Sequence, residues 1–242
     1  MVFSRFRSNW ILISALALLL IVPAMFSVAS APDDFARIAP GYRSIKTMGE
    51  LEYIEVNTPA EDGSPKQLIV FVHGTPGSFS AFLHYVDDPV MREHFHMISV
   101  TRPGWIDSSA TKIPSLNEQA KALEPIIKMD LLGKGAILMG HSYGGPVIAR
   151  TAMDYPELVA GLIFVATTAD PEFSGPRWQD LVTPVLIVQG DRDRLVNPRN
   201  ADFLNQMLVN ADVTYLKREG QGHFVLWEEA ELIRDTLIEK FL

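Results

Sequence analysis

The sequence predicts an α/β fold, with a mostly parallel central sheet and helices on both of its faces. Short apolar runs rich in Val, Ile and Leu alternate with segments of helical periodicity from about residue 50 onward, and this alternation is typical of parallel sheets. The runs contain few polar residues, as expected of strands that are covered on both faces. The 242 residues, 48% of them hydrophobic, suit one large domain with a substantial core.

One edge strand and several central strands are expected. Residues 51–56 alternate apolar and polar side chains, which indicates a half-buried edge strand. The run 68–72 is expected to be a central strand covered on both faces. Further strands are expected at residues 96–100, 136–139, 159–165 and 185–188, and the last strand at 213–216. Helices are expected at residues 115–129, 145–153, 197–208 and 226–241, with a short one around 176–181. Ser115 and Glu118 form a capping box for the first of these helices, and Pro125 is expected to kink it.

The motif at residues 140–144 is the centre of this predicted fold. It reads Gly-His-Ser-Tyr-Gly and directly follows the apolar run 136–139. It matches G-x-S-x-G, in which a strand turns sharply into a helix and leaves the serine hydroxyl exposed at the bend. Glycines are needed there because the serine backbone is strained and the helix passes close to the strand. The motif therefore indicates Ser142 as a candidate nucleophile.

Two later strands are also followed directly by groups that can do chemistry. Residues 189–193 read Gln-Gly-Asp-Arg-Asp and residues 220–223 read Gly-Gln-Gly-His. Ligands of a parallel sheet bind beyond the carboxyl ends of its strands, so these groups are expected near the serine. A serine hydroxyl needs a base to remove its proton, and histidine suits that role because its pKa lies near neutral pH. We therefore predict Ser142 as the nucleophile and His223 as the base.

The order serine, acid, histidine, together with the His-Gly-Thr-Pro-Gly loop at residues 73–77, resembles the α/β-hydrolase fold superfamily. The resemblance covers about residues 50–242. Its G-x-x-D pattern implies that Asp193 is the acid that orients His223. Asp191 stays the alternative, and its expected role is to hold the turn. Asp170 is a remoter candidate, better interpreted as a loop residue.

The resemblance also implies where the negative charge of a tetrahedral intermediate would be stabilised. In this fold two backbone N–H groups form the oxyanion hole, and the matching positions here are Thr75 and Tyr143. Pro76 has no amide hydrogen to donate, which favours Thr75. His73 is expected to bond within its own loop.

A further loop, Arg-Pro-Gly-Trp at residues 102–105, resembles the family's D-R-P-G-x-G-x-S loop, but Thr101 replaces its Asp. Trp105 is a candidate for lining the substrate pocket, and an aromatic residue there is equally well interpreted as core packing. The same two interpretations apply to the other aromatic candidates, Phe79, Phe224 and Trp227.

The site is expected to be open. Many relatives insert a helical cap between the strands that end here near residue 165 and begin at residue 185, but only residues 166–184 separate them. The chain therefore resembles a capless or minimally capped serine hydrolase. An open site favours an ester or related acyl substrate that is reached from solvent or from a membrane surface.

We thus expect a serine hydrolase that acts through an acyl-enzyme on a carboxylic ester or related small-molecule acyl substrate, without a cofactor. Thioester, lactone, amide or carbon–carbon bond hydrolysis, and a catalytically silent membrane-tethered binding module, remain alternatives. The net charge of −8 argues against a nucleic-acid partner. The absence of cysteine excludes thiolate catalysis and cysteine-based zinc sites, and the histidines lack metal-binding spacing. The sequence does not indicate an oligomeric state.

The N-terminus is expected to be a separate unit. Residues 1–10 carry Arg5 and Arg7 and no acid, and residues 11–31 are almost wholly apolar. This is the layout of a secretory signal with an Ala-Ser-Ala cleavage site at residues 29–31, or of an uncleaved anchor long enough to span a bilayer. Both interpretations place the hydrolase domain outside the cytoplasm, exported (periplasmic or extracellular) or membrane-anchored. We divide the chain into this segment (1–31), a linker (32–49) and the α/β-hydrolase domain (50–242).

Overall fold

The computed structural model describes residues 44–57, 60–105, 114–169 and 176–242. The predicted signal or anchor segment at residues 1–31 and most of the predicted linker lie outside the described residues. Within the described ranges, no helix combines the length and the apolar character needed to cross a membrane.

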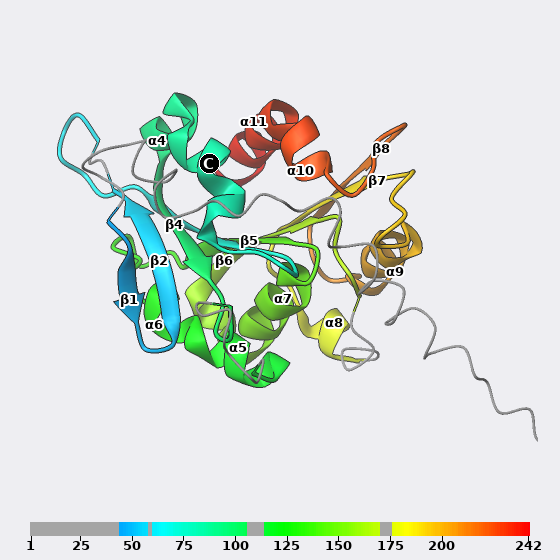
Figure 1. Cartoon of the computed structure of the whole chain (residues 1–242), viewed down its shortest axis with the longest axis horizontal. Helices are drawn as coiled ribbons and strands as arrows, with labels where there is room; N and C mark the ends of the chain where they lie inside the picture. The colour runs from blue at the N-terminus through cyan, green and yellow to red at the C-terminus, as the bar shows by residue number, and fades with distance from the viewer. Residues whose placement is uncertain (1–43, 58–59, 106–113, 170–175) are drawn as a thin grey trace, which may run out of the picture. The chain divides into compact units, whose positions relative to one another are not determined.

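The domain is built around one central sheet, as predicted (Figure 1). The sheet has eight strands in the order β1-β2-β4-β3-β5-β6-β7-β8. The first two pairings, β1 with β2 and β2 with β4, are antiparallel, and all the others are parallel. The strands are β1 (Lys46–Met48), β2 (Leu51–Val56), β3 (Gln67–Val72), β4 (Phe95–Thr101), β5 (Ala136–His141), β6 (Val159–Val165), β7 (Val185–Gly190) and β8 (Val213–Arg218).

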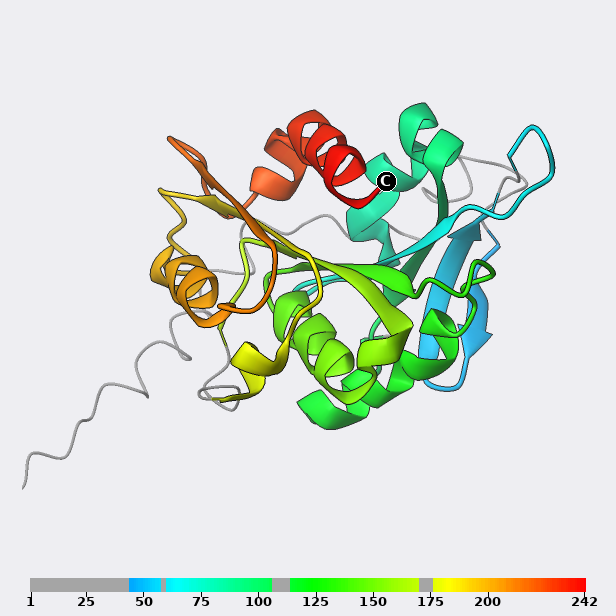
Figure 2. The same ribbon diagram turned by 180° about the vertical axis from the view of Figure 1, so that it is seen from behind.

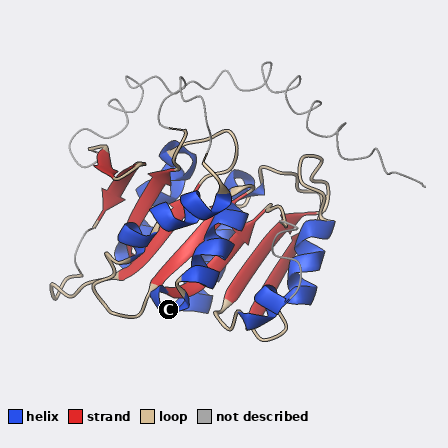
Figure 3. Cartoon of the chain, turned by 90° about the horizontal axis from the view of Figure 1, so that it is seen from below, coloured by secondary structure: helices blue, strands red, loops and turns tan. Residues whose placement is uncertain are grey.

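Helices cover both faces of this sheet. Figure 1 and the reverse view in Figure 2 show α10 and α11 on the face opposite to α7, and Figure 3 shows helices lying along the strands. The helices are η2 (Phe79–Phe82), α3 (Leu83–Asp87), α4 (Pro89–His94), α5 (Leu116–Ala122), α6 (Glu124–Ile127), α7 (Gly144–Asp154), η3 (Pro156–Leu158), α8 (Pro176–Asp180), α9 (Arg199–Met207), α10 (Val225–Glu228) and α11 (Ala230–Phe241).

The structure differs from the prediction at β1 and at the helix that begins with α5. The end of the predicted linker forms β1, which pairs with β2 across a turn at Gly49, where φ is +58°. The helix expected at 115–129 is two helices, because Pro125 in the first turn of α6 cannot donate the hydrogen bond that would continue α5. The capping box at its start is confirmed, since the Ser115 hydroxyl accepts from the Glu118 amide and the Glu118 carboxylate accepts from the Ser115 amide.

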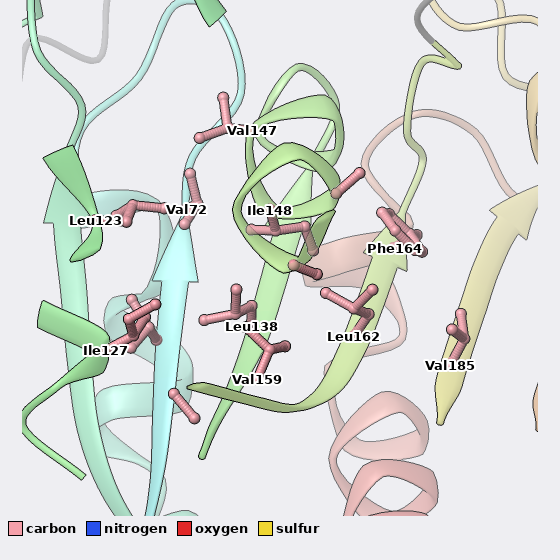
Figure 4. Close-up of a cluster of buried hydrophobic side chains, with 14 of the residues drawn as sticks. Val72, Leu123, Ile127, Leu138, Val147, Ile148, Val159, Leu162, Phe164 and Val185 are labelled. Atoms are coloured by element: carbon pink, nitrogen blue, oxygen red, sulfur yellow. The ribbon is translucent and has the colours of Figure 1, made fainter. Parts of the chain in front are cut away.

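The core that supports the site lies between the central strands and α7. Figure 4 shows Val72 of β3, Leu138 of β5 and Leu162 of β6 in one cluster with Val147 and Ile148 of α7. All five side chains are fully buried. Burying an aliphatic side chain of this size contributes about 1.5 to 3 kcal/mol, so this cluster fixes α7 firmly over the sheet.

The turn between β5 and α7 depends on two glycines. A Cβ atom on Gly144 would lie 2.1 Å from the carbonyl oxygen of Val72, and one on Gly140 would lie 2.6 Å from the backbone of Gly144. Between them Ser142 has φ +52°, in the left-handed region that a serine rarely adopts. Its amide donates to the Val165 carbonyl at 3.0 Å, which helps to hold this strained conformation. The predicted strand–turn–helix is confirmed.

Replacing Gly144 with alanine should therefore destabilise the protein by at least about 2 kcal/mol, because the new methyl group would meet backbone atoms that cannot rotate away. Gly222→Ala is the matched control, since a Cβ there meets nothing within 4 Å, and its effect should stay within about 0.5 kcal/mol. The measurement is urea denaturation of the full chain. Equal stabilities for the two variants would contradict the close approach.

Candidate active site

The predicted site residues follow four parallel strands at one edge of the sheet. Thr75 follows β3, Ser142 follows β5, Asp193 follows β7 and His223 follows β8. Because these strands are parallel to one another within the sheet, their carboxyl ends face the same way. The topology therefore gathers residues from distant parts of the chain at a single edge, as expected of a parallel sheet.

His223 and Asp193 form a buried pair. The imidazole Nδ1 lies 2.8 Å from Asp193 Oδ2, and the residues are 8% and 6% exposed. The other carboxylate oxygen accepts from the amides of Leu195 and Val196 at 2.9 and 2.8 Å. Gln189 Nε2 also donates to Oδ2 at 3.1 Å. The bond to Asp193 occupies Nδ1, so Nε2 is the ring nitrogen left to act as a base.

These contacts keep the Asp193 carboxylate charged. Burial raises the pKa of Asp193, but hydrogen bonds from His223 and from the amides of Val196 and Leu195 together hold the pKa below its usual value. A buried carboxylate facing Nδ1 stabilises an imidazolium ring when it forms. The pair therefore has the electrostatics that a general base requires.

Asp191 makes a different contact. Its side chain is exposed, and Oδ1 accepts from the amide of Gly220 at 2.7 Å. Its own amide donates to the carbonyl of Arg218 at 3.0 Å. The carboxylate that binds the imidazole is thus that of Asp193, as the resemblance implied. Asp191 instead links the loops after β7 and β8. Asp170 lies outside the described residues.

Ser142 directly follows a residue that contacts this pair. That residue, His141, has its ring centre 4.8 Å from that of His223, and its Nε2 lies 3.1 Å from the His223 carbonyl oxygen. Ser142 is 9% exposed. Among the described contacts there is no hydrogen bond between the Ser142 hydroxyl and His223. Such bonds are often long in unliganded enzymes and tighten when substrate binds.

The two residues expected to form the oxyanion hole also lie at the serine. A Cβ on Gly74 would lie 2.8 Å from the Ser142 Cβ, so the loop that carries Thr75 passes directly beside the serine. Tyr143 directly follows Ser142 and is the N-cap residue of α7. Both positions are thus next to the candidate nucleophile.

The neighbouring histidines have structural surroundings. His73 Nδ1 lies 2.6 Å from the Gly74 carbonyl, and its Nε2 accepts from the Arg102 amide at 3.0 Å. Burial holds the pKa of His73 well below its usual value, lowers the pKa of His141 to about 3 and lowers that of His84 to about 4. These rings are neutral at pH 7, and no group of three or more potential metal ligands occurs in the described part of the chain.

The aromatic candidates divide between core and surface. Phe79 is 8% exposed, and its backbone is bonded to the side chains of Ser99 and Thr101, so it belongs to the core. Phe224 is 39% exposed, with its ring centre 5.9 Å from that of His223. Trp105 is half-buried, edge-on to the ring of His73. The exposed ring beside the predicted base is the strongest candidate for contact with substrate.

Two side chains near the site were not predicted. Gln189 is fully buried and binds Asp193. Arg102 is also buried, with contacts to the Thr75 loop. A polar residue that ends an otherwise apolar strand was the available signal for Gln189, and for Arg102 it was the family-like loop that contains it.

Known proteins are similar in sequence to parts of this chain. The sequence model of the α/β hydrolase fold family matches residues 67–182. A 1-acylglycerol-3-phosphate O-acyltransferase of Arabidopsis thaliana is 31% identical over 127 residues, which cover 50% of this chain and 29% of that protein. Cutinase est1 of Thermobifida alba is 32% identical over 120 residues, 43% of this chain and 39% of the cutinase. The matched segments thus span well under half the length of these curated relatives.

A solved structure extends the likeness to the whole fold. The structure of a predicted CIB-like hydrolase from Thermoplasma acidophilum covers 81% of this chain and 95% of its own, with a TM-score of 0.66 and 19% sequence identity. At this identity the likeness concerns the fold alone.

Buried neutral His141 should make the protein less stable in acid. The unfolded chain takes up this proton below about pH 6.5, whereas the folded protein does so only near pH 3, so stability falls as the pH drops through that window. His141→Gln should make the free energy of unfolding fall less steeply between pH 5.5 and 4, by up to about 1.4 kcal/mol per pH unit. Chemical denaturation at several pH values measures the slope, and parallel profiles for the two proteins would contradict it.

Proposed function

The chain belongs to the α/β-hydrolase fold superfamily, and from that premise we propose that it is a serine hydrolase. It forms an acyl-enzyme with a carboxylic ester or a related small-molecule acyl substrate. The observation that supports this most directly is the buried hydrogen bond of 2.8 Å between Asp193 and His223, next to a strained turn that carries Ser142. A binding module would have no need of a charged carboxylate kept buried against a histidine.

In the proposed reaction, His223 Nε2 takes the proton of the Ser142 hydroxyl as its oxygen attacks the carbonyl carbon. The amides of Thr75 and Tyr143 donate to the oxyanion of the tetrahedral intermediate. Collapse of the intermediate breaks the bond to the alcohol, which receives the proton from His223 and leaves an acyl-serine. Water then attacks the acyl-serine with His223 again as base. The products are the carboxylic acid and free Ser142.

The ester preference is supported by the form of the site and by one class of relative. In its described part, the segment between β6 and β7 contains as its only helix the short α8, and these described residues form no helical cap. Phe224 directly follows His223, and Leu195 lies two residues after Asp193; they are 39% and 51% exposed and give the site apolar surroundings. Cutinases occur among the proteins with similar sequence. An open apolar site suits an acyl group that enters from outside.

The localisation of the protein and the type of bond it hydrolyses remain predictions. Export or membrane anchoring depends on residues 1–31, which lie outside the described part of the chain. Hydrolysis of thioester, lactone, amide or carbon–carbon bonds would use the same residues, so these reactions remain alternatives to ester hydrolysis.

A fluorophosphonate probe should label the wild-type chain, because it is attacked only by an activated serine. Ser142→Ala should abolish labelling and His223→Ala should slow it by about 10³-fold or more. His94→Ala is the matched control and should leave labelling unchanged. His94 is the last residue of α4, directly before the amino end of β4, which is parallel to β3, so it lies at the end of the strands opposite to the site. A folded wild-type protein that resists the probe would favour a binding module instead.

Replacing the two aspartates separately tests which one orients the base. Asp193→Asn should lower kcat on p-nitrophenyl esters by about 10³- to 10⁴-fold, because the amide favours the wrong imidazole tautomer. Asp191→Asn should change kcat less than about tenfold and instead weaken the link to Gly220, at a cost of about 1 kcal/mol in stability. The assay uses esters of graded chain length, which also defines the acyl preference. Similar losses of kcat in both variants would refute the assignment.

A further inference from the structure

Arg102 is a fully buried cation beside the proposed oxyanion hole. Its side chain is 1% exposed. Nη2 donates to the Gly74 carbonyl and to Thr75 Oγ1, both at 2.8 Å, and Nη1 donates to Gln119 Oε1 at 2.5 Å. The Arg102 amide also donates to His73 Nε2 at 3.0 Å. The backbone of Arg102 thus binds His73, and its side chain binds Gly74 and Thr75, so both hold the loop after β3 in place.

The same guanidinium lies against the second half of the oxyanion hole. Its central carbon is 5.2 Å from the ring centre of Tyr143 and 5.5 Å from that of Trp105, within the range of cation–π attraction. Arg102 therefore binds the side chain of Thr75 and contacts the ring of Tyr143. These are the two residues whose amides are proposed to donate to the oxyanion.

No carboxylate of the described residues neutralises this charge. The partners of the guanidinium are carbonyl, hydroxyl and amide oxygens, and its Nε has no hydrogen-bond partner. Thr101 stands where the family-like loop has an Asp. Burial lowers the pKa of Arg102 to about 10, which still leaves it charged at neutral pH. Removing a charge from water costs several kcal/mol of stability when no opposite charge offsets it, and the described residues provide none for Arg102, so its burial beside the reactive serine indicates a role.

We propose that Arg102 is a positioning residue of the oxyanion hole, which fixes the Thr75 loop relative to Tyr143 and sets a buried positive charge beside the oxygen that becomes negative. The inference rests on the proposed hydrolase function. Negative charge develops on that oxygen only in the transition state, so a fixed cation close by lowers the barrier without tightening substrate binding. Arg102 touches none of the reacting atoms and acts through Thr75 and Tyr143.

A purely structural arginine would behave differently. Its loss would lower stability and would weaken catalysis only as far as the fold loosens. A positioning residue affects kcat, and affinity for a tetrahedral adduct, more than it affects KM. The two roles therefore separate in kinetics.

The test compares Arg102→Met and Arg102→Lys with wild type, in the full chain, after wild type has been shown to react with the fluorophosphonate probe. Circular dichroism and thermal unfolding check that each variant is folded. For Arg102→Met we expect kcat on the best p-nitrophenyl ester to fall about 10- to 100-fold, with KM within about threefold. The Ki of an alkyl boronic acid, which forms a tetrahedral adduct with serine, should rise by the same factor as kcat falls. Arg102→Lys keeps the positive charge but loses the planar guanidinium that binds several acceptors at once. Its kcat should therefore lie between those of Arg102→Met and wild type.

Gln67→Met is the matched control for loss of a buried polar side chain. Gln67 is 7% exposed and donates to the Gly135 carbonyl at 2.6 Å. It lies at the amino end of β3, whereas Ser142 follows the carboxyl end of the parallel strand β5. It should cost stability and leave kcat unchanged. Thr75→Val keeps the Thr75 amide but removes the hydroxyl that binds Arg102, so its effect on kcat should not add to that of Arg102→Met.

The outcomes are distinct. Unchanged kcat and boronate affinity in a folded Arg102→Met or Arg102→Lys variant overturn the inference while leaving the hydrolase proposal intact. Additive losses in the Arg102→Met/Thr75→Val pair overturn the path through Thr75. If Arg102→Met does not fold, Arg102→Lys and Thr75→Val decide by the same readouts. Wild-type protein that is inert to the probe refutes the hydrolase proposal itself.

Discussion

The close passage of α7 over the sheet is the constraint on which the rest of the structure depends. It requires that Gly144 and Gly140 carry no side chain, because each would otherwise meet backbone atoms at 2.1 to 2.6 Å. This passage forces the chain through the left-handed conformation at Ser142, where φ is +52°. The apolar cluster below α7 supplies the stabilisation that such a strained turn needs. These two glycines therefore fix the backbone conformation of Ser142 and with it the orientation of its side chain.

Parallel pairing extends this order to the other site residues. Strands β3, β5, β7 and β8 deliver their following loops to one edge of the sheet, so residues far apart in sequence meet without any long connection. Burial then sets their charges: the Asp193 carboxylate is held ionised by three donors, and the ring of His141 is held neutral. The electrostatics of the site thus follow from the same packing that forms the fold.

Strands and the serine turn could be predicted because their signals are local. Continuous apolar runs marked the central strands, and G-x-S-x-G marked Ser142. Two local features differed from the prediction. Strand β1 was missed although it pairs with the neighbouring β2, and Pro125, expected only to kink a helix, divides it into α5 and α6. Asp193 and Asp191 are equivalent by residue type, and only the family's G-x-x-D pattern favoured Asp193. In the structure their roles differ through their partners after β8. Arg102 is ordinary in sequence, because its importance comes from contacts with residues about 30 positions earlier.

The hydrogen bonds between the loops after β7 and β8 have a mechanical consequence. Gly220 donates to the Asp191 carboxylate, Asp191 donates to the Arg218 carbonyl and Arg192 donates to the Gln221 carbonyl. The approach is so tight that a Cβ on Gly190 would lie 2.3 Å from the Gln221 carbonyl oxygen. The two loops therefore move as one body. A shift of these two loops therefore changes the distance between the His223 imidazole and Ser142. The hydrogen bond between His223 and Asp193 is kept, because both residues lie on the loops that shift together.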